Sequence, residues 1–404
     1  MKIYKSNRKI YLRSICVFII LFVLCEPAYL SHTWLSIVFG LGKYVAIVAV
    51  LILYFINRKV TPYMICLMLL QSIIVVSTFL NEGDLYGSIT LFIKFISIAM
   101  LTQMELQHSA KSYLKILINL FSILLFINFI TILVYPDGLY TTTRVLSDST
   151  SWIDPRYWFL GFKNGIGKYI LATLCFKAVY DTLYVKKITS GFIFLSIISY
   201  WSLIMIWSAT SLFTVGLFII FILFAIPIIA KKNWKIFSMK SYLIITVALF
   251  LVIVIFQNSS IFYYLIENIF KKNAITFSGR TFIWNNAFKW IKASPLLGYG
   301  VQPVNTVIYM LGGNKHYSDC HNYFINTTFQ GGIVALGFLL AIFIMCTKKL
   351  NSIRNTTASK IMGFCIFCFF VMFLTENTTN PILWILITLA YHLPEISGQN
   401  NSYK

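Results

Sequence analysis

Long, uninterrupted runs of apolar residues recur along the whole chain and limit the folds that it can adopt. Most runs are about 17–25 residues long, the length that an α-helix needs to cross a bilayer. Because lipid offers the backbone no hydrogen-bond partners, only helices and closed β-barrels span a membrane, and these runs are continuous rather than alternating. They predict an all-α integral membrane protein in which residues 1–404 form a single polytopic membrane domain.

The apolar windows predict about twelve transmembrane helices. Their expected ranges are 13–31, 35–56, 63–80, 87–102, 113–135, 166–185, 190–207, 209–229, 241–257, 323–346, 360–375 and 380–393. Charged residues make up only 11% of the chain, whereas a soluble domain carries about 25%. The net charge of +21 comes without a basic low-complexity tail, so it indicates membrane lipid as a partner and not nucleic acid.

The positions of lysine and arginine predict an orientation. With the N-terminus inside, the cytoplasmic connections hold Lys and Arg, as at 58–59, 186–187 and 231–240, and the short outer loops hold almost none. This is the positive-inside pattern. We therefore expect a multi-pass protein of the cell membrane with both termini in the cytoplasm.

Two outer segments are much longer than the other loops: 136–165 and 258–322. Long loops in compact proteins are usually functional or disordered, and the aromatic content here predicts ordered structure with interfacial helices. One such helix is expected near 279–293, where Ile283, Trp284 and Ala287 recur on one face. It is either a basic helix lying on anionic lipid, or a support that places Arg280 over a lipid pyrophosphate.

His321 and Asn322 stand at the outer end of the span that begins near residue 323. Histidine is suited to accept a proton near neutral pH, although a single histidine is more often structural. A metal site formed with His316, Asp319 and Cys320 matches no familiar zinc spacing, so no metal or other cofactor is expected.

The first long loop contributes further cations. Arg144 and Arg156 lie among aromatic residues, and Lys163-Asn164 closes the loop. The arginines are equally explained as anchors at the membrane surface or as a second phosphate clamp.

Several short motifs, in order, resemble those of the O-antigen polymerase/ligase superfamily. Its G-R-x-x-x-W…P-x-x-G-x-G stretch is similar to the run formed by Gly279, Arg280, Trp284, Pro295, Gly298 and Gly300. Its H-N-x-x…G element is similar to His321, Asn322 and Gly332. Segments of the Wzy-like capsular polysaccharide polymerases are similar to Leu160-Gly161, Lys163-Asn164, residues 208–211, and Thr375-Glu376 with Pro381. The resemblance covers roughly residues 156–385.

The resemblance implies a metal-independent, inverting glycosyltransferase-type polymerase. His321 would be the base that activates an acceptor hydroxyl, and Arg280 would stabilise the undecaprenyl pyrophosphate leaving group. Arg156, or alternatively Arg144, would be the second clamp. Further substrate contacts are expected from Lys163, Asn164, Trp284 and Asn322. Many relatives have an arginine where this chain has Ser211-Leu212, so no cation is assigned there.

The predicted function is therefore polymerisation of undecaprenyl-pyrophosphate-linked oligosaccharide repeat units into capsular or O-antigen-type polysaccharide. A ligase of the same superfamily would use the same donor site, and the sequence does not separate the two. A flippase or exporter is the alternative of another class, but such proteins line a cavity with charges inside spans. A chain-length regulator and a flippase are the expected protein partners.

Overall fold

The computed structural model describes residues 2–57, 60–145, 151–229, 237–255, 264, 279–314, 317–377 and 380–399. The N-terminal part forms α1 (Lys2–Leu24), the 3-10 helix η1 (Ala28–His32), α2 (Leu35–Asn57), α3 (Pro62–Leu80) and α4 (Leu85–Val134). A small sheet follows, with strands β1 (Tyr140–Val145), β2 (Ser151–Trp158) and β3 (Gly161–Phe162). The middle part forms α5 (Lys163–Tyr180), η2 (Asp181–Val185), α6 (Ser190–Ile206), α7 (Ala209–Ile220), η3 (Phe221–Ala225), α8 (Ile226–Ile229), α9 (Met239–Phe250) and η4 (Leu251–Ile255). The C-terminal part forms α11 (Arg280–Ala293), α12 (Val304–Met310), α13 (Tyr323–Ser352), α14 (Thr357–Phe373) and α15 (Pro381–Gln399).

The predicted spans all fall wholly or largely on helices. Two of them, 87–102 and 113–135, form the two parts of α4, which meet at Ser109, where the backbone is not helical. Within the described residues, 5 helical stretches are long and apolar enough to cross a membrane: Leu35–Ile56, Pro62–Leu80, Leu85–Val134, Ala209–Ile229 and Tyr323–Ser352. Shorter apolar helices, such as Ser190–Ile206 and Thr357–Phe373, complete the bundle.

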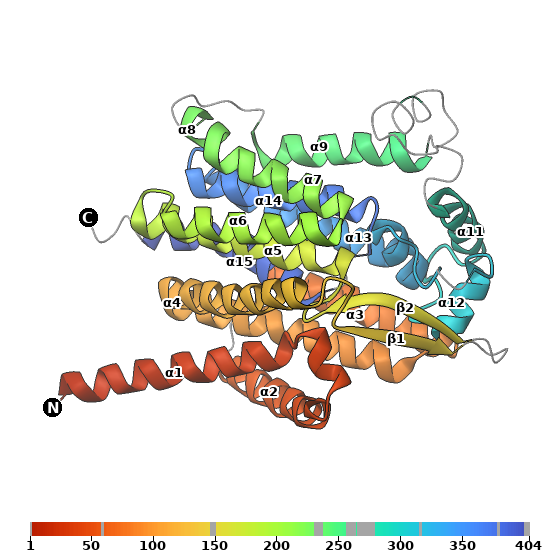
Figure 1. Ribbon diagram of the computed structural model, residues 1–404, viewed down its shortest axis with the longest axis horizontal. Coiled ribbons are helices and arrows are strands. Elements are labelled where there is room, and N and C mark those ends of the chain that lie inside the picture. Colours follow the sequence, from red (N-terminus) through yellow and green to blue (C-terminus); the bar gives the residue numbers. More distant parts are fainter. Residues whose placement is uncertain are drawn as a thin grey trace.

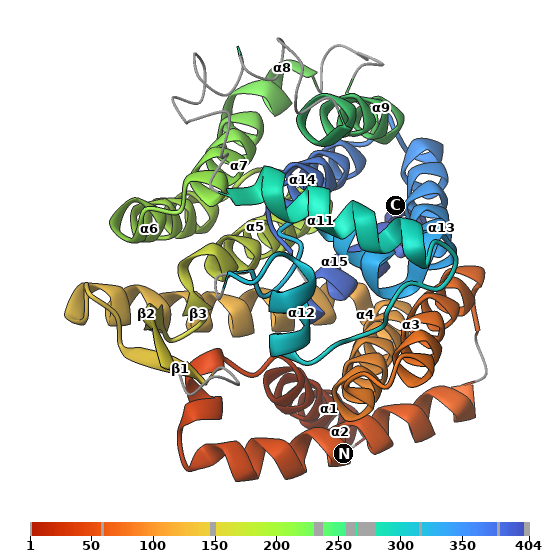
Figure 2. The ribbon, with the colours of Figure 1, turned by 90° about the vertical axis from the view of Figure 1, so that its right-hand side faces the viewer.

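The bundle has a buried centre and an apolar exterior. α5, α14 and α15 lie in the middle (Figure 2), and almost every side chain of α15 from Ile382 to Leu393 is buried. α2, α6 and α9 lie at the periphery, where large apolar side chains such as Val45 and Phe194 are exposed. Exposed apolar side chains around a buried helical core are what a bilayer would cover.

The first long loop differs from the expectation of an interfacial helix, because its described residues form a three-stranded antiparallel sheet in the order β1-β2-β3. Its residues explain the difference: Tyr, Thr, Val, Ile and Trp favour strands over helices. The sheet is joined to the bundle by Tyr29 N–H, which donates to Phe159 O (3.1 Å), and by Leu160 N–H, which donates to Asn128 Oδ1 (2.9 Å).

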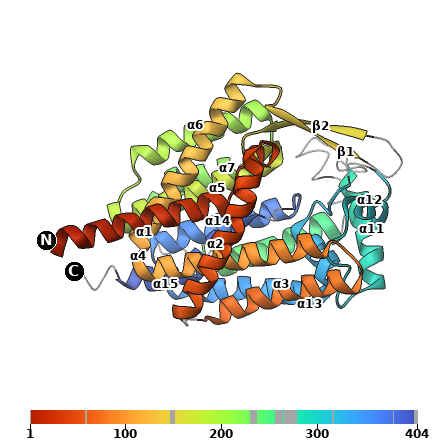
Figure 3. The same ribbon diagram turned by 90° about the horizontal axis from the view of Figure 1, so that it is seen from below.

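The second long loop lies at the same end of the bundle as the sheet (Figures 1 and 3). α1 begins and α15 ends at the opposite end (Figure 1). Both long loops are therefore at one end of the molecule. The charge pattern also predicted that the two loops lie on the same side of the membrane.

The run from Pro295 to Gly300 attaches α11 to the bundle through its backbone. α13 is interrupted at Gly332 (φ 64°), which leaves the carbonyls of Phe329 and Gln330 to accept from Tyr299 N–H (2.9 Å) and Gly300 N–H (2.7 Å). Gly300 also adopts a positive φ, and a side chain there would overlap the backbone of Thr78 in α3. The glycines of this motif therefore permit close backbone packing that fixes the second loop.

Candidate functional site

Five segments far apart in the sequence meet at the loop end of the bundle: the starts of α5, α7 and α11, the segment before α13, and the turn after α14. Arg280 opens α11, and its Nη2 forms an ion pair with Glu376 Oε1 (2.9 Å). Its Nε donates to the carbonyl of Thr375 (3.0 Å). The side chains of Arg280 and Glu376 are 13% and 14% exposed, so the pair is largely shielded from solvent.

Asn164, in the first turn of α5, belongs to the same network. Its Nδ2 donates to Glu376 Oε1 (3.1 Å). Residues 208–211 are attached to it, since Ser208 Oγ donates to Asn164 Oδ1 (3.4 Å) and Thr210 Oγ1 is 3.3 Å from Thr375 Oγ1. Four of the motif pieces, which contain Asn164, residues 208–211, Arg280 and Thr375-Glu376, are thus brought into one hydrogen-bonded group, with Glu376 at its centre.

His321 lies next to this group. Its Nδ1 is 3.5 Å from Asp319 Oδ1, and its side chain is 29% exposed. It adopts φ 44°, an uncommon backbone conformation for a residue other than glycine. Such outliers persist only where surrounding contacts impose them, and they cluster at functional sites.

The contacts that hold His321 come from its neighbours on both sides. Its own N–H donates to Asp319 Oδ1 (2.6 Å), and Trp284 Nε1 donates to Cys320 O (3.0 Å). Asn322 caps α13 by accepting from the N–H groups of Phe324 and Ile325, and its Nδ2 donates to Leu374 O (3.0 Å). Trp284 and Asn322 are fully buried, so in this structure they position His321 and the turn before Glu376.

The surroundings of Glu376 shift its pKa in opposite directions. Burial raises the pKa of this carboxyl above its ordinary value, and Arg280, His321 and the Asn164 hydrogen bond act in the opposite direction. Lys168, in the second turn of α5, interacts electrostatically with Glu376 and Asp319. The sequence reasoning did not single out Lys168 or give Glu376 a role, although Thr375-Glu376 was among the matched motifs.

The cations of the first long loop are not hydrogen-bonded to the group around Glu376 among the described residues. Arg156 sits on β2 with φ 64°, at an irregularity where the pairing shifts between Tyr140 and Thr142. Its side chain is exposed and does not join the hydrogen-bonded group around Glu376 within the described residues. Arg144 pairs with Trp152 across the sheet, but its side chain lies outside the described residues. Lys163 begins α5 next to Asn164 and is partly exposed.

The arrangement can bind an anion and accept a proton. Arg280 offers a guanidinium group suited to phosphate oxygens, and the His321 imidazole lies near its partner Glu376, with the Asp319 carboxylate to orient it. His316 lies outside the described residues, so its place in a metal group is not described. Burial raises the pKa of the Cys320 thiol well above its ordinary value, which disfavours the thiolate that a metal would need.

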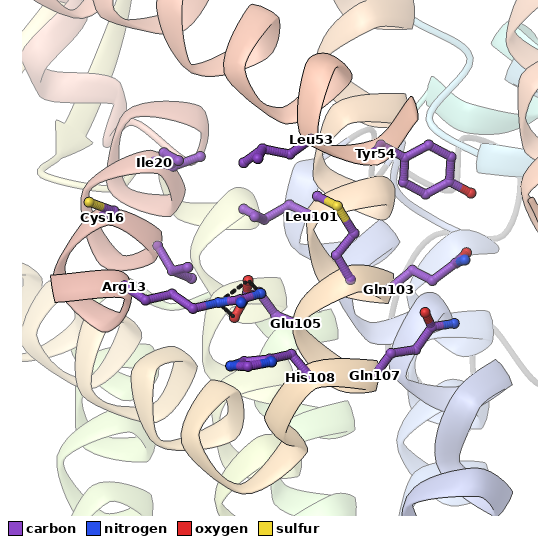
Figure 4. Close-up of a pocket in the computed structure, with 12 residues that line it drawn as sticks. Arg13, Cys16, Ile20, Leu53, Tyr54, Leu101, Gln103, Glu105, Gln107 and His108 are labelled. Carbon is purple, nitrogen blue, oxygen red and sulfur yellow. Dashed lines mark hydrogen bonds and ion pairs between the residues drawn. The ribbon is translucent and has the colours of Figure 1, made fainter. Parts of the chain in front are cut away.

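A separate cavity of about 440 Å³ lies among α1, α2 and α4 (Figure 4). Arg13 and Glu105 form an ion pair in it (2.7 Å), and His108 and Gln107 also line it. None of these helices contributes a side chain to the hydrogen bonds around Glu376 described above, so this cavity is distinct from the candidate site.

Comparison with known families gives a match over residues 192–340 to a family described as O-antigen ligase. The matched range includes Ser208, Arg280 and His321 but ends before Glu376. It confirms the resemblance to the O-antigen polymerase/ligase superfamily, and with the apolar helices it identifies a membrane protein. No curated protein and no solved structure matches the chain.

Proposed function

We propose that this protein polymerises undecaprenyl-pyrophosphate-linked oligosaccharide repeat units into capsular or O-antigen-type polysaccharide at the outer face of the cytoplasmic membrane. The observation that carries the proposal is the meeting of Arg280 and His321 beside Glu376. These residues come from three separate segments, and they supply an anion-binding cation and a proton acceptor in one place.

In the proposed reaction His321 takes the proton of an acceptor sugar hydroxyl as that oxygen attacks the anomeric carbon of the donor. The bond from this carbon to the pyrophosphate oxygen breaks, and the leaving group departs with the electron pair. Arg280 stabilises the negative charge that develops there, with Arg156 or Arg144 as the second clamp. Attack opposite the leaving group inverts the anomeric centre, and no metal ion is needed because a pyrophosphate is already a competent leaving group.

The same geometry supports the proposed orientation. Both long loops lie at the end of the bundle opposite the start of α1 and the end of α15, which supports cytoplasmic termini and an outer site. The apolar exterior of the bundle would accommodate the polyprenyl chain while the charged headgroup reaches Arg280. A flippase that delivers the repeat units and a chain-length regulator are the proposed protein partners.

A ligase that transfers finished glycan to a different acceptor is the second candidate, because the matched family is described as O-antigen ligase. A ligase and a polymerase would share Arg280 and His321 and would differ in the acceptor. The test is a deletion strain analysed by gel electrophoresis of its lipid-linked and surface glycans. Single repeats on the outer leaflet support the polymerase, intact polymer left on its lipid carrier indicates the ligase, and single repeats trapped inside indicate a flippase.

A further inference from the structure

Glu376 binds its two side-chain partners through one oxygen. Arg280 Nη2 (2.9 Å) and Asn164 Nδ2 (3.1 Å) both donate to Oε1. Among the described residues, neither of these side chains donates a hydrogen bond to Oε2. A proton on Oε2 would therefore leave both hydrogen bonds in place, because the carbonyl-like Oε1 still accepts them.

A proton on Glu376 would remove a negative charge that repels an incoming anion. The groups that face Glu376 are Arg280 from α11, Lys168 from α5, and Asp319 and His321 from the segment before α13. Arg280 and Lys168 are the basic residues of this group, and Glu376 and Asp319 are its carboxyl groups. A diphosphate that approaches Arg280 would meet the negative charge of Glu376 at the same guanidinium.

We infer that Glu376 is a proton-linked counter-ion: it neutralises Arg280 in the empty site and takes up one proton from water when a diphosphate group binds there. This inference rests on the proposed function for its ligand, the diphosphate group of a donor that is esterified at both ends. It adds that the carboxylate holds the anion position in the resting protein and that donor binding carries a proton with it.

Burial favours the protonated carboxyl, since it raises the pKa of Glu376, and the negative charge of a diphosphate at Arg280 offsets the opposing influence of the guanidinium. The sign follows from linkage: a ligand that takes up a proton binds more tightly as the pH falls. Glutamine has the shape of the protonated acid and keeps one acceptor oxygen, so Glu376→Gln should reproduce the ligand-ready state at every pH.

The test measures binding of inorganic pyrophosphate to the full-length protein in lipid nanodiscs, from about pH 5 to about pH 8. Pyrophosphate itself titrates in this range, so the readout is the ratio of the wild-type Kd to the Glu376→Gln Kd at each pH. The ratio should approach one at the acidic end and rise by at most about tenfold per pH unit toward the alkaline end. Asp137→Asn, in the exposed turn before β1, is the control and should leave the pH dependence of wild-type binding unchanged.

A ratio that stays constant across the range would overturn the role of Glu376 while leaving the pyrophosphate site in place. A fall in affinity for Glu376→Gln at every pH would also overturn it, because Glu376 would then act only as a structural support. If neither protein binds pyrophosphate but both elongate lipid-linked repeats, the inference fails and the proposed function stands. Binding with the predicted ratio but without elongation would instead count against the polymerase and leave Glu376 as inferred.

Discussion

Arg280 Nη2 lies 2.9 Å from Glu376 Oε1, which joins the first residue of α11 to the turn between α14 and α15. The Nε of the same guanidinium donates to Thr375 O, so one turn of the chain holds two of its nitrogens. A guanidinium held in this way is oriented before a substrate arrives. Such pre-orientation is what electrostatic stabilisation of a leaving group requires.

Replacing Arg280 should therefore impair the reaction far more than the fold. We expect Arg280→Ala to lower elongation of lipid-linked repeats by about 10²–10³-fold, the loss typical for removal of one group that stabilises developing negative charge. Arg280→Lys keeps the positive charge but loses the forked geometry of the guanidinium. We expect it to lower elongation by about 10–100-fold, the loss expected for one charge-assisted hydrogen bond of roughly 1.5–3 kcal/mol. Product per unit time is measured in membranes with equal protein.

Lys289→Ala is the matched control for Arg280, because Lys289 is an exposed cation on the same helix and donates a long hydrogen bond to Asn286 Oδ1 (3.4 Å). It should elongate like the wild type. Equal losses for the Lys289 and Arg280 variants would indicate that the general basic character of α11 matters, and not an Arg280 leaving-group contact.

His321→Ala should remove the proton acceptor. Loss of a positioned base typically lowers a rate by about 10²–10⁴-fold, and kcat should fall while binding of the donor is retained. Donor binding and elongation are measured separately on the same nanodisc preparation. His32→Ala, which changes an exposed histidine packed on Tyr140, is the control. Wild-type elongation by His321→Ala would contradict a catalytic base at this position.

The sequence predicted the helices well because a continuous apolar run of membrane-spanning length folds as a helix. The helix predicted in the first loop was wrong, because the β-forming residues between Tyr140 and Trp158 form a sheet and carry a weaker sequence signal than a span. Arg280 and His321 were found through motif order, but the role of Glu376 depends on contacts across 96 and 212 positions that only the folded topology reveals. Trp284 and Asn322 were predicted to contact substrate, which stays a prediction; both are buried and hydrogen-bonded inside the protein, so a positioning role is the alternative that a motif does not distinguish.

Asn322 tests this distinction. Asn322→Ala removes the cap of α13 and the hydrogen bond to Leu374 O, and should destabilise the protein by about 2–3 kcal/mol, from about 1–2 for a cap and about 1 for a hydrogen bond. The measurement is the apparent Tm in nanodiscs together with the KM for the lipid-linked donor. Asn351→Ala, near the other end of α13, should leave both unchanged. A higher KM for Asn322→Ala at an unchanged Tm would restore Asn322 as a substrate contact.

Gly300 and Gly337 give a matched pair for the backbone contact that fixes the second loop. Gly300→Ala should lower the apparent Tm strongly, because the new methyl group would overlap the backbone of Thr78 and the residue has φ 72°. A steric and conformational conflict of this kind costs about 2–4 kcal/mol. Gly337→Ala adds the same methyl group to α13 where no atom lies within 4 Å, so it should be neutral or stabilise the helix by up to about 1 kcal/mol. Equal Tm values for the two variants would show that α11 is not anchored to the bundle through Gly300.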